Sequence, residues 1–423
     1  MTTPTPSSHV AAFERLGFGM FIHWGIYASL GMGEKTLHFN KIPRAEYREL
    51  MKRFTASRFD TREIARLAKD SGMRYITLTA RHHDGFSLFD TRGLNDYDAP
   101  HSACRRDLVG EFVEACRAEG IAPFLYHTTL DWWQDSFESD FPAYLDYLHE
   151  SVELLCRNYG KLGGLWFDGN WSKRGADWQE DRLYGMIRRY QPEAMIINNT
   201  GIGRRGEAGH PELDSLTFEN GRPGRIDREG APKYLAAEMC QTMNTRWGFG
   251  SLDFSYKSPA EIIETLCVCR RYGANYLLNV SPDGEGEIPL IQRAILGNTA
   301  AWIAHCPGEV IYTGRPAEIE CDDCSKDFAL SDSGELYLFI HDLGAGGDRH
   351  IVIDGAKCGI RRFTGIPGRV LSARWTDNGE ELSFTQSRSE DALELYCTPY
   401  PYAQNHVVRV CRLTVEQHPI YIH

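Results

Sequence analysis

The sequence contains no long apolar run and no cluster of basic residues. None of its apolar stretches approaches the roughly 20 residues that a helix needs to cross a bilayer. Met1–His9 has neither the basic start nor the apolar core of a signal peptide. The formal net charge of -12, without a Lys/Arg-rich block, argues against a nucleic-acid surface. We therefore expect no membrane and no nucleic-acid partner, a cytoplasmic location, and a small neutral or polar ligand.

Cysteine is present, but not in a pattern that indicates disulfides or a complete metal site. Cys116, Cys156 and Cys267 lie within helix-like apolar patterns, so we expect the twelve cysteines to be mostly buried, reduced thiols. Cys321 and Cys324 have the spacing of half a zinc site, but no second Cys-x-x-Cys and no nearby His pair accompanies them. A turn between strands is the favoured interpretation, and we expect no metal and no cofactor.

Short segments with strand character, each ending in or followed by a polar residue, recur along the chain. They are Phe18–His23, Tyr75–Ala80, Pro123–His127, Gly164–Asp168, Met195–Asn199, Ser215–Glu219, Leu235–Glu238 and Asn275–Asn279. Helical patterns separate most of them, at Thr61–Lys69, Asp107–Ala118, Tyr144–Cys156 and Pro259–Arg271. This order predicts an α/β fold, a (β/α)8 barrel, whose active site lies at the carboxyl ends of the strands. The connections on either side of the sixth strand are only about 15 residues long, so we expect an irregular barrel there.

The pattern changes after Gly314-Arg315-Pro316. The β-rich runs that follow are Glu335–His341, His350–Asp354, Val370–Trp375, Leu393–Cys397 and Val407–Leu413. Gly, Asp or Asn lies between them, and no helical pattern intervenes. We therefore predict a catalytic barrel over residues 1–314 and an antiparallel β-sandwich over residues 315–423.

A carboxylate at the end of the fourth strand is the main candidate for chemistry. Asp168 closes the run Trp166-Phe167-Asp168-Gly169 and is expected to project into the mouth of the barrel. There it can attack an electrophilic carbon while a second carboxyl group protonates the leaving group. Glu219 and Glu238 are the available partners. Such a pair is the minimum apparatus of a retaining glycosidase, whose carboxyl groups lie roughly 5 to 5.5 Å apart.

Three histidines follow the first two strands. Imidazoles donate to and accept from sugar hydroxyls, so His23, His82 and His83 fit a sugar site. Adjacent side chains on an extended segment point in opposite directions, and His82 and His83 share a ligand only if the chain bends, which Gly85 allows. A metal-dependent barrel hydrolase is the rival interpretation. It is less favoured because the first strand lacks His-x-His and no His ends strands five to eight.

The motifs around these residues resemble the α-L-fucosidases of glycoside hydrolase family twenty-nine. The matching runs, in family order, are Phe18-Gly19-Met20-Phe21-Ile22-His23-Trp24-Gly25, His82-His83-Asp84-Gly85-Phe86, Trp166-Phe167-Asp168-Gly169 and Asn275-Tyr276-Leu277-Leu278-Asn279-Val280. The resemblance covers about Phe18 to Pro289. It implies a barrel followed by a sandwich, and a retaining, metal-free hydrolysis of terminal α-L-fucose through a covalent fucosyl-enzyme. The substrate is then a small molecule or glycan that carries terminal fucose.

The resemblance also implies roles for single residues. Asp168 matches the nucleophile, and Glu219 is preferred to Glu238 as the general acid/base. The residues matched to substrate binding are the histidines His23, His82 and His83, the carboxylate Glu34, and the aromatic walls Phe21, Tyr126 and Trp166.

Two residues depart from the family pattern. Lys35 follows Glu34 where the family often has Trp, and Thr200 follows Asn199 where many members have Arg. These changes leave Asp168 in place. They keep open a related sugar as substrate, or a fucose-binding protein that has lost catalysis. The linkage is also open, as is the oligomeric state, for which a homo-oligomer is one interpretation.

Overall fold

The computed structural model describes residues 3–199, 209–346, 358–387 and 392–416. These residues form two compact units. The first runs to Lys257 and resumes over Ala274–Gly297, and the second comprises Ser258–Gly273 and the chain from Asn298 onward. The boundary after residue 314 stays a prediction, and the first antiparallel strand begins at Arg315.

Eight parallel strands form the sheet of the first unit, in the order β5-β4-β3-β2-β1-β8-β7-β6. They are β1 Phe18–Ile22, β2 Tyr75–Arg81, β3 Ala122–Thr128, β4 Gly164–Asp168, β5 Met195–Asn198, β6 Ser215–Glu219, β7 Ala236–Thr242 and β8 Asn275–Val280. The predicted barrel is confirmed, and the strands match the predicted segments closely. The exception is β7, which continues to Thr242 instead of ending at Glu238.

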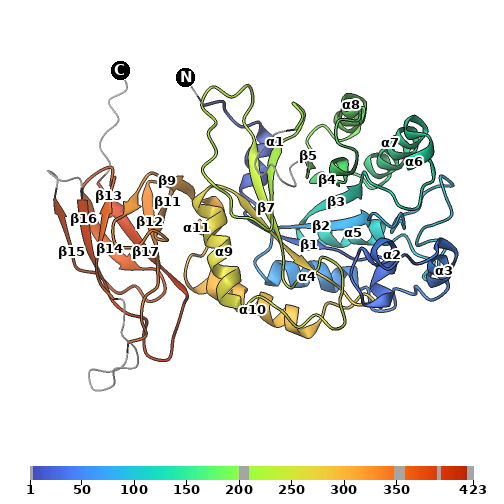
Figure 1. The fold of residues 1–423 in the computed structure, drawn as a ribbon. Coiled ribbons are helices and arrows are strands. Elements are labelled where there is room, and N and C mark those ends of the chain that lie inside the picture. Colours follow the sequence, from blue (N-terminus) through green and yellow to red (C-terminus); the bar gives the residue numbers. More distant parts are fainter. Residues whose placement is uncertain (1–2, 200–208, 347–357, 388–391, 417–423) are drawn as a thin grey trace. The chain divides into compact units, whose positions relative to one another are not determined.

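Helices α4 (Thr61–Asp70), α5 (Leu108–Glu119), α7 (Phe141–Asn158) and α8 (Glu180–Tyr190) connect successive strands and lie outside them (Figure 1). Asp60, Asp107 and Asp140 start the first three, because each carboxylate accepts backbone N–H groups of the first turn. The sequence patterns predicted these three helices. The fourth, α8, was not predicted: the residue before it, Gln179, is not a typical N-cap residue, and its side chain makes no capping hydrogen bond.

The barrel is irregular beside β6, as the short connections predicted. Residues 220–235 join β6 to β7 without a helix. The N–H of Asn220 donates to the Cys240 carbonyl at 2.8 Å, which extends the parallel pairing of β6 with β7 by one residue before this connection begins. Short helical turns occupy the loops at the carboxyl ends of other strands, namely η1 Ile26–Leu30, α2 Thr36–Phe39, α3 Arg44–Arg48, η2 Glu49–Lys52, α6 Ser136–Ser139 and η3 Asn170–Lys173.

Helix α1 (Ser8–Glu14) lies at the amino ends of the strands. Its Phe13 ring lies 5.6 Å from the ring of Tyr75, the first residue of β2, and 5.8 Å from the ring of Phe124, the third residue of β3. The Asn275 amide donates to the Phe13 carbonyl at 2.7 Å. These contacts close the amino end of the barrel with a continuous apolar cluster that reaches up to Phe21, so a ligand reaches the interior from the carboxyl end.

The second unit contains two antiparallel sheets, drawn in orange and red in Figure 1. One has the order β10-β13-β16-β15 and the other β14-β17-β12-β11-β9. The strands are β9 Arg315–Ala317, β10 Glu320–Cys321, β11 Phe328–Asp332, β12 Glu335–His341, β13 Gly359–Thr364, β14 Val370–Trp375, β15 Phe384–Ser387, β16 Ala392–Cys397 and β17 Val408–Val415. Apolar residues from both sheets form its core, which confirms the predicted sandwich.

The rest of the second unit is partly helical. Its helices are α9 Pro259–Arg271, the end of α10 Leu290–His305, and α11 Val310–Thr313. The predicted strand His350–Asp354 falls outside the described residues. Cys321 ends β10 and Cys324 lies in the turn between β10 and β11, as predicted, and all twelve cysteines are free thiols. Over the described part of the chain, no helix is both long and apolar enough to cross a bilayer.

Candidate active site

A narrow pocket opens at the carboxyl ends of the barrel strands. The residues that line it are Phe21, His23, Lys35, His82, His83, Tyr126, Trp166, Asp168, Trp171, Asn199, Glu219, Cys240 and Trp247. Eight of the ten site residues singled out in the sequence are among them. The other two, Glu34 and Glu238, do not line the pocket.

Asp168 is held by four donors. Its Oδ2 lies 3.2 Å from the Tyr126 hydroxyl and 3.4 Å from His83 Nε2. Its Oδ1 lies 2.9 Å from Trp171 Nε1 and 3.4 Å from Asn199 Nδ2. Burial raises the pKa of a carboxyl group, but the hydrogen bond and charge of His83, with the Trp171 N–H, hold the pKa of Asp168 below its ordinary value. The carboxylate is therefore ionised and oriented for attack.

The backbone after Asp168 requires glycine. Gly169 has a φ of 127°, and a Cβ there would lie 2.4 Å from the Leu130 nitrogen. The Asp168 carbonyl accepts from the Thr129 N–H at 2.7 Å, which joins the ends of β4 and β3. The chain then reverses into η3 and brings the Trp171 indole back onto the carboxylate.

The pKa of Glu219 is shifted in the opposite direction to that of Asp168. Its Oε2 accepts from Asn199 Nδ2 at 2.7 Å. Burial and the nearby charge of Asp168 raise the pKa of Glu219, because both disfavour a second negative charge in the pocket. One carboxyl group is thus held ionised and the other favours its proton, which is the division of labour between a nucleophile and a general acid.

The three histidines differ in what their Nδ1 atoms contact. His23 Nδ1 pairs with Asn279 Oδ1 at 2.7 Å, and burial lowers the pKa of His23 to about 3. Burial also lowers the pKa of His82, whose Nδ1 has no hydrogen-bond partner among the described residues. Both rings are therefore neutral, and His82 keeps a polar atom for a ligand. His83 Nδ1 pairs with the Thr128 hydroxyl at 2.6 Å.

His82 and His83 both line the pocket because the chain bends after β2. The N–H of Gly85 donates to the His82 carbonyl at 2.9 Å, and Gly85 has a φ of 78°. The bend expected at Gly85 is present, and it brings the two imidazole centroids to 4.3 Å.

Glu238 lies deeper in the barrel than the pocket. Its side chain is 1% exposed, and its oxygens accept from the Tyr75 hydroxyl at 2.6 Å and from Trp166 Nε1 at 2.8 Å. Burial raises the pKa of Glu238 to about 7. Its neighbour on the same face of β7, Cys240, is the residue that reaches the pocket. Glu238 therefore holds the Trp166 ring from below.

Glu34 is directed into a loop. It is 4% exposed, and its Oε2 accepts from the Gly248 N–H at 2.9 Å. This contact fixes the chain beside Trp247, which lines the pocket. The neighbouring Lys35 lines the pocket as well, so the residue that departs from the family pattern lies in the pocket itself.

Sequence reasoning missed Trp171, Asn199, Trp247, Lys35 and Cys240 as pocket residues. Asn199 follows the fifth strand, so its position at a strand end was the available signal. Thr200 lies outside the described residues. The pocket histidines and carboxyl groups do not gather into a three-ligand metal group within the described ranges, which gives the metal-dependent alternative no geometric support.

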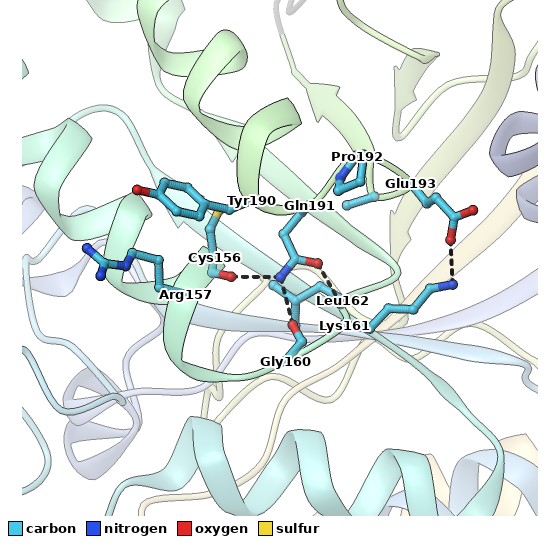
Figure 2. A pocket seen from close by; sticks show the side chains of 10 residues that line it. Cys156, Arg157, Gly160, Lys161, Leu162, Tyr190, Gln191, Pro192 and Glu193 are labelled. Carbon is cyan, nitrogen blue, oxygen red and sulfur yellow. Dashed lines mark hydrogen bonds and ion pairs between the residues drawn. The ribbon is translucent and has the colours of Figure 1, made fainter.

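A second hollow, of about 500 Å³, lies at the other end of the barrel, where the loops precede β4 and β5. Figure 2 shows Gln191 at its centre. The Gln191 amide donates to the carbonyls of Cys156 and Gly160 at 2.7 Å, and its oxygen accepts from the Leu162 N–H at 3.1 Å. These bonds satisfy the amide internally. The hollow contains no group prepared for catalysis, consistent with a structural role for this face of a barrel.

Comparison with known proteins identifies relatives over nearly the whole chain. Residues 4–306 match the family model described as alpha-L-fucosidase. Tissue alpha-L-fucosidase of Rattus norvegicus is 26% identical over 361 residues, which cover 78% of this chain and 76% of the relative. The solved alpha-L-fucosidase isoenzyme 1 from Paenibacillus thiaminolyticus has 31% identity and a TM-score of 0.82, and covers 97% of this chain and 99% of its own.

A more distant structure shares the fold. It is an alpha-L-fucosidase of family GH29 from Bacteroides thetaiotaomicron, trapped as a covalent intermediate, with 21% identity and a TM-score of 0.81 over 99% of this chain and 98% of its own. The family match spans more than half of the sequence and includes every residue of the pocket. The chain therefore belongs to the alpha-L-fucosidase family and is a glycoside hydrolase.

Proposed function

We propose that the protein hydrolyses terminal α-L-fucosides with retention of anomeric configuration. The observation that carries this proposal is that one amide nitrogen, Asn199 Nδ2, contacts both Asp168 Oδ1 and Glu219 Oε2. Two contacts of 3.4 and 2.7 Å to a single atom limit the separation of these oxygens to about 6 Å, which suits the roughly 5 to 5.5 Å spacing of retaining enzymes. The trapped covalent intermediate of the Bacteroides relative is the species that this route requires.

The reaction has two displacements. The Asp168 carboxylate attacks the anomeric carbon as the bond to the leaving oxygen breaks, and Glu219 gives its proton to that oxygen. Glu219, now ionised, removes a proton from water, which attacks the same carbon and releases Asp168. The low pKa of Asp168 and the raised pKa of Glu219 support this assignment over one with the roles reversed.

The pocket walls support a deoxy sugar. His23 and His82 are neutral and each combines donor and acceptor nitrogens, which matches neutral hydroxyl groups better than a charged substituent. Phe21 and Trp166 pack edge to face with their centroids 5.3 Å apart, and Tyr126 stacks on Trp166 at 5.7 Å. This apolar side accepts the C6 methyl of fucose, which contributes only about 1 to 3 kcal/mol of discrimination.

The direct test is hydrolysis of 4-nitrophenyl α-L-fucoside, followed by proton NMR of the first fucose released. We expect nitrophenol release that survives chelation, and the α anomer as the first product. The β anomer would exclude retention. Binding of fucose without hydrolysis of this fucoside or of natural fucosylated oligosaccharides would instead indicate a binding protein.

The pH dependence of kcat/KM follows from the two carboxyl groups. Activity requires ionised Asp168 and protonated Glu219, so we expect an acidic limb below the ordinary aspartate pKa of 3.8 and an alkaline limb above the ordinary glutamate pKa of 4.5. The hydrogen bond from Asn199 lowers the pKa of Glu219. Asn199→Leu should therefore move the alkaline limb to higher pH. An alkaline limb that stays in place in this variant would show that Glu219 does not control it.

We also propose a cytoplasmic location. The support is that none of the twelve cysteines forms a disulfide, although Cys358 is exposed and Cys321 and Cys324 are half-buried. Free thiols suit a reducing compartment. Fractionation of the producing cells tests this, and recovery of the protein outside the cytoplasm would contradict it.

A further inference from the structure

Two histidines and an aspartate meet in the second unit, away from the pocket. His305 is the last residue of α10, Asp377 lies in the turn after β14, and His406 lies in the loop before β17. One ligand atom from each lies within 4.8 Å of the others, and no other group of three or more potential metal ligands occurs in the described part of the chain. Three segments that are distant in sequence therefore present ligand atoms to one point.

Asp377 is fixed by a buried guanidinium. Its side chain is 1% exposed, and Arg409 donates through Nε to Oδ1 and through Nη2 to Oδ2, both at 3.0 Å. Arg409 also lies 4.2 Å above the Trp375 ring and 3.6 Å from Glu380 Oε2. A forked pair uses one lone pair of each carboxylate oxygen and leaves the other free. Two carboxylates around one guanidinium leave a net negative charge, which favours a further cation.

His406 presents an unused lone pair to this carboxylate. Its side chain is 9% exposed, and Nε2 lies 2.9 Å from Gln404 Oε1, an oxygen that only accepts. When Nε2 donates to this oxygen, the neutral ring has no proton on Nδ1. That buried Nδ1 has no hydrogen-bond partner among the described residues, and it faces Asp377 Oδ2 at 3.8 Å. Two acceptors oppose each other with nothing to bridge them.

His305 completes the group from the solvent side. Its ring is exposed and lies 4.9 Å from the His406 ring, nearly perpendicular to it. Ligand atoms at roughly 2.0 to 2.2 Å from a tetrahedral ion lie about 3.4 Å apart. The 3.8 Å between Nδ1 of His406 and Oδ2 of Asp377 is close to that separation, and an exposed imidazole rotates freely enough to supply the third contact.

We propose that His305, Asp377 and His406 bind a divalent transition-metal ion through two imidazole nitrogens and one carboxylate oxygen. Zinc suits this donor set, with water in the remaining position. The ion would tie the end of α10 to the turn after β14 and the loop before β17. It is a structural site, and it is independent of the proposed fucoside hydrolysis.

The test is a metal titration of the full-length, chelator-stripped protein. Cys321 and Cys324 are competing ligands, so the parent for all variants carries Cys321→Ser and Cys324→Ser. Cobalt(II) is added and its visible absorption recorded, zinc is then added to displace it, and zinc affinity is measured by calorimetry. We expect one equivalent of metal, and a rise in the unfolding midpoint when zinc is present.

Single substitutions identify the ligands. His305→Ala, at an exposed position, and His406→Gln should each weaken zinc binding by on the order of 100-fold. Gln404→Leu should weaken it by about tenfold, because the variant lacks the oxygen that holds the proton of His406 on Nε2. His101→Ala is the matched control, since His101 pairs with Asp98 at 2.6 Å without a third ligand. It should change nothing. If zinc binds the parent no more tightly than it binds His305→Ala or His406→Gln, the proposal is wrong.

Discussion

Asp168→Asn is expected to lower the turnover of 4-nitrophenyl α-L-fucoside by on the order of 10⁴-fold or more. The amide has nearly the same shape as the carboxylate, so the donors around it, including Tyr126 and Trp171, retain their positions. It is not a nucleophile, however, and it carries no charge to stabilise the positive anomeric carbon. Initial rates with fucose binding measured in parallel separate loss of chemistry from loss of the pocket.

Chemical rescue gives the same prediction a second readout. Asp168→Gly removes the nucleophile and leaves room for a small anion. Azide should then restore part of the turnover and yield a β-fucosyl azide, because one displacement replaces two. Wild-type rates in Asp168→Asn, or an α-configured azide product, would refute the assignment.

Glu219→Gln and Glu238→Gln should behave very differently, although both replace a carboxyl group on neighbouring strands, half-buried in the first case and buried in the second. We expect Glu219→Gln to lower kcat/KM by on the order of 10² to 10⁴-fold for fucosides with poor leaving groups, and by less for nitrophenyl fucosides, whose departure needs no proton. Glu238→Gln should cost less than about tenfold with both substrate types, since a neutral amide still pairs with Tyr75 and Trp166.

The comparison of leaving groups decides between the two glutamates. For each variant, log kcat/KM is plotted against the pKa of the leaving group for a series of fucosides, and the slopes are compared. A steep slope for Glu219→Gln alone would establish it as the acid. A steep slope for Glu238→Gln would instead assign the general acid to Glu238. The pocket would then have to extend deeper into the barrel, as far as Glu238 on β7.

The strand ends could be predicted from sequence because two signals coincide there, an apolar run and the polar residue that stops it. Asp168 and Glu219 are the last residues of β4 and β6, so both were placed correctly at the carboxyl edge. Glu238 was placed there too, but β7 continues past it to Thr242. In the sequence, an acidic residue within a strand cannot be distinguished from one that ends the strand. The difference depends on its hydrogen-bond donors, which for Glu238 are Tyr75 and Trp166 on other strands.

The contacts between residues at the ends of different strands could not be predicted from the sequence. Nothing in the run Asn198-Asn199 indicates that one amide contacts two carboxyl groups on β4 and β6. In the sandwich, β13 was missed because Arg361 occupies a buried position, where it lies 3.4 Å from Asp327. A charge at a core-facing position breaks the apolar alternation by which strands are recognised.

The proton on Glu238 couples the stability of the barrel to acidity. Below the ordinary glutamate pKa of 4.5, folded and unfolded chains both hold this proton. As the pH rises towards about 7, the unfolded chain has lost it while the folded chain keeps it, so ionisation favours unfolding. Above that pH the free energy of unfolding is lower by the full cost of ionising Glu238 in the folded chain, about 3 kcal/mol for a pKa shift of this size. The contribution of the residue beneath Trp166 to the stability of the fold is therefore more favourable in acid than in alkali.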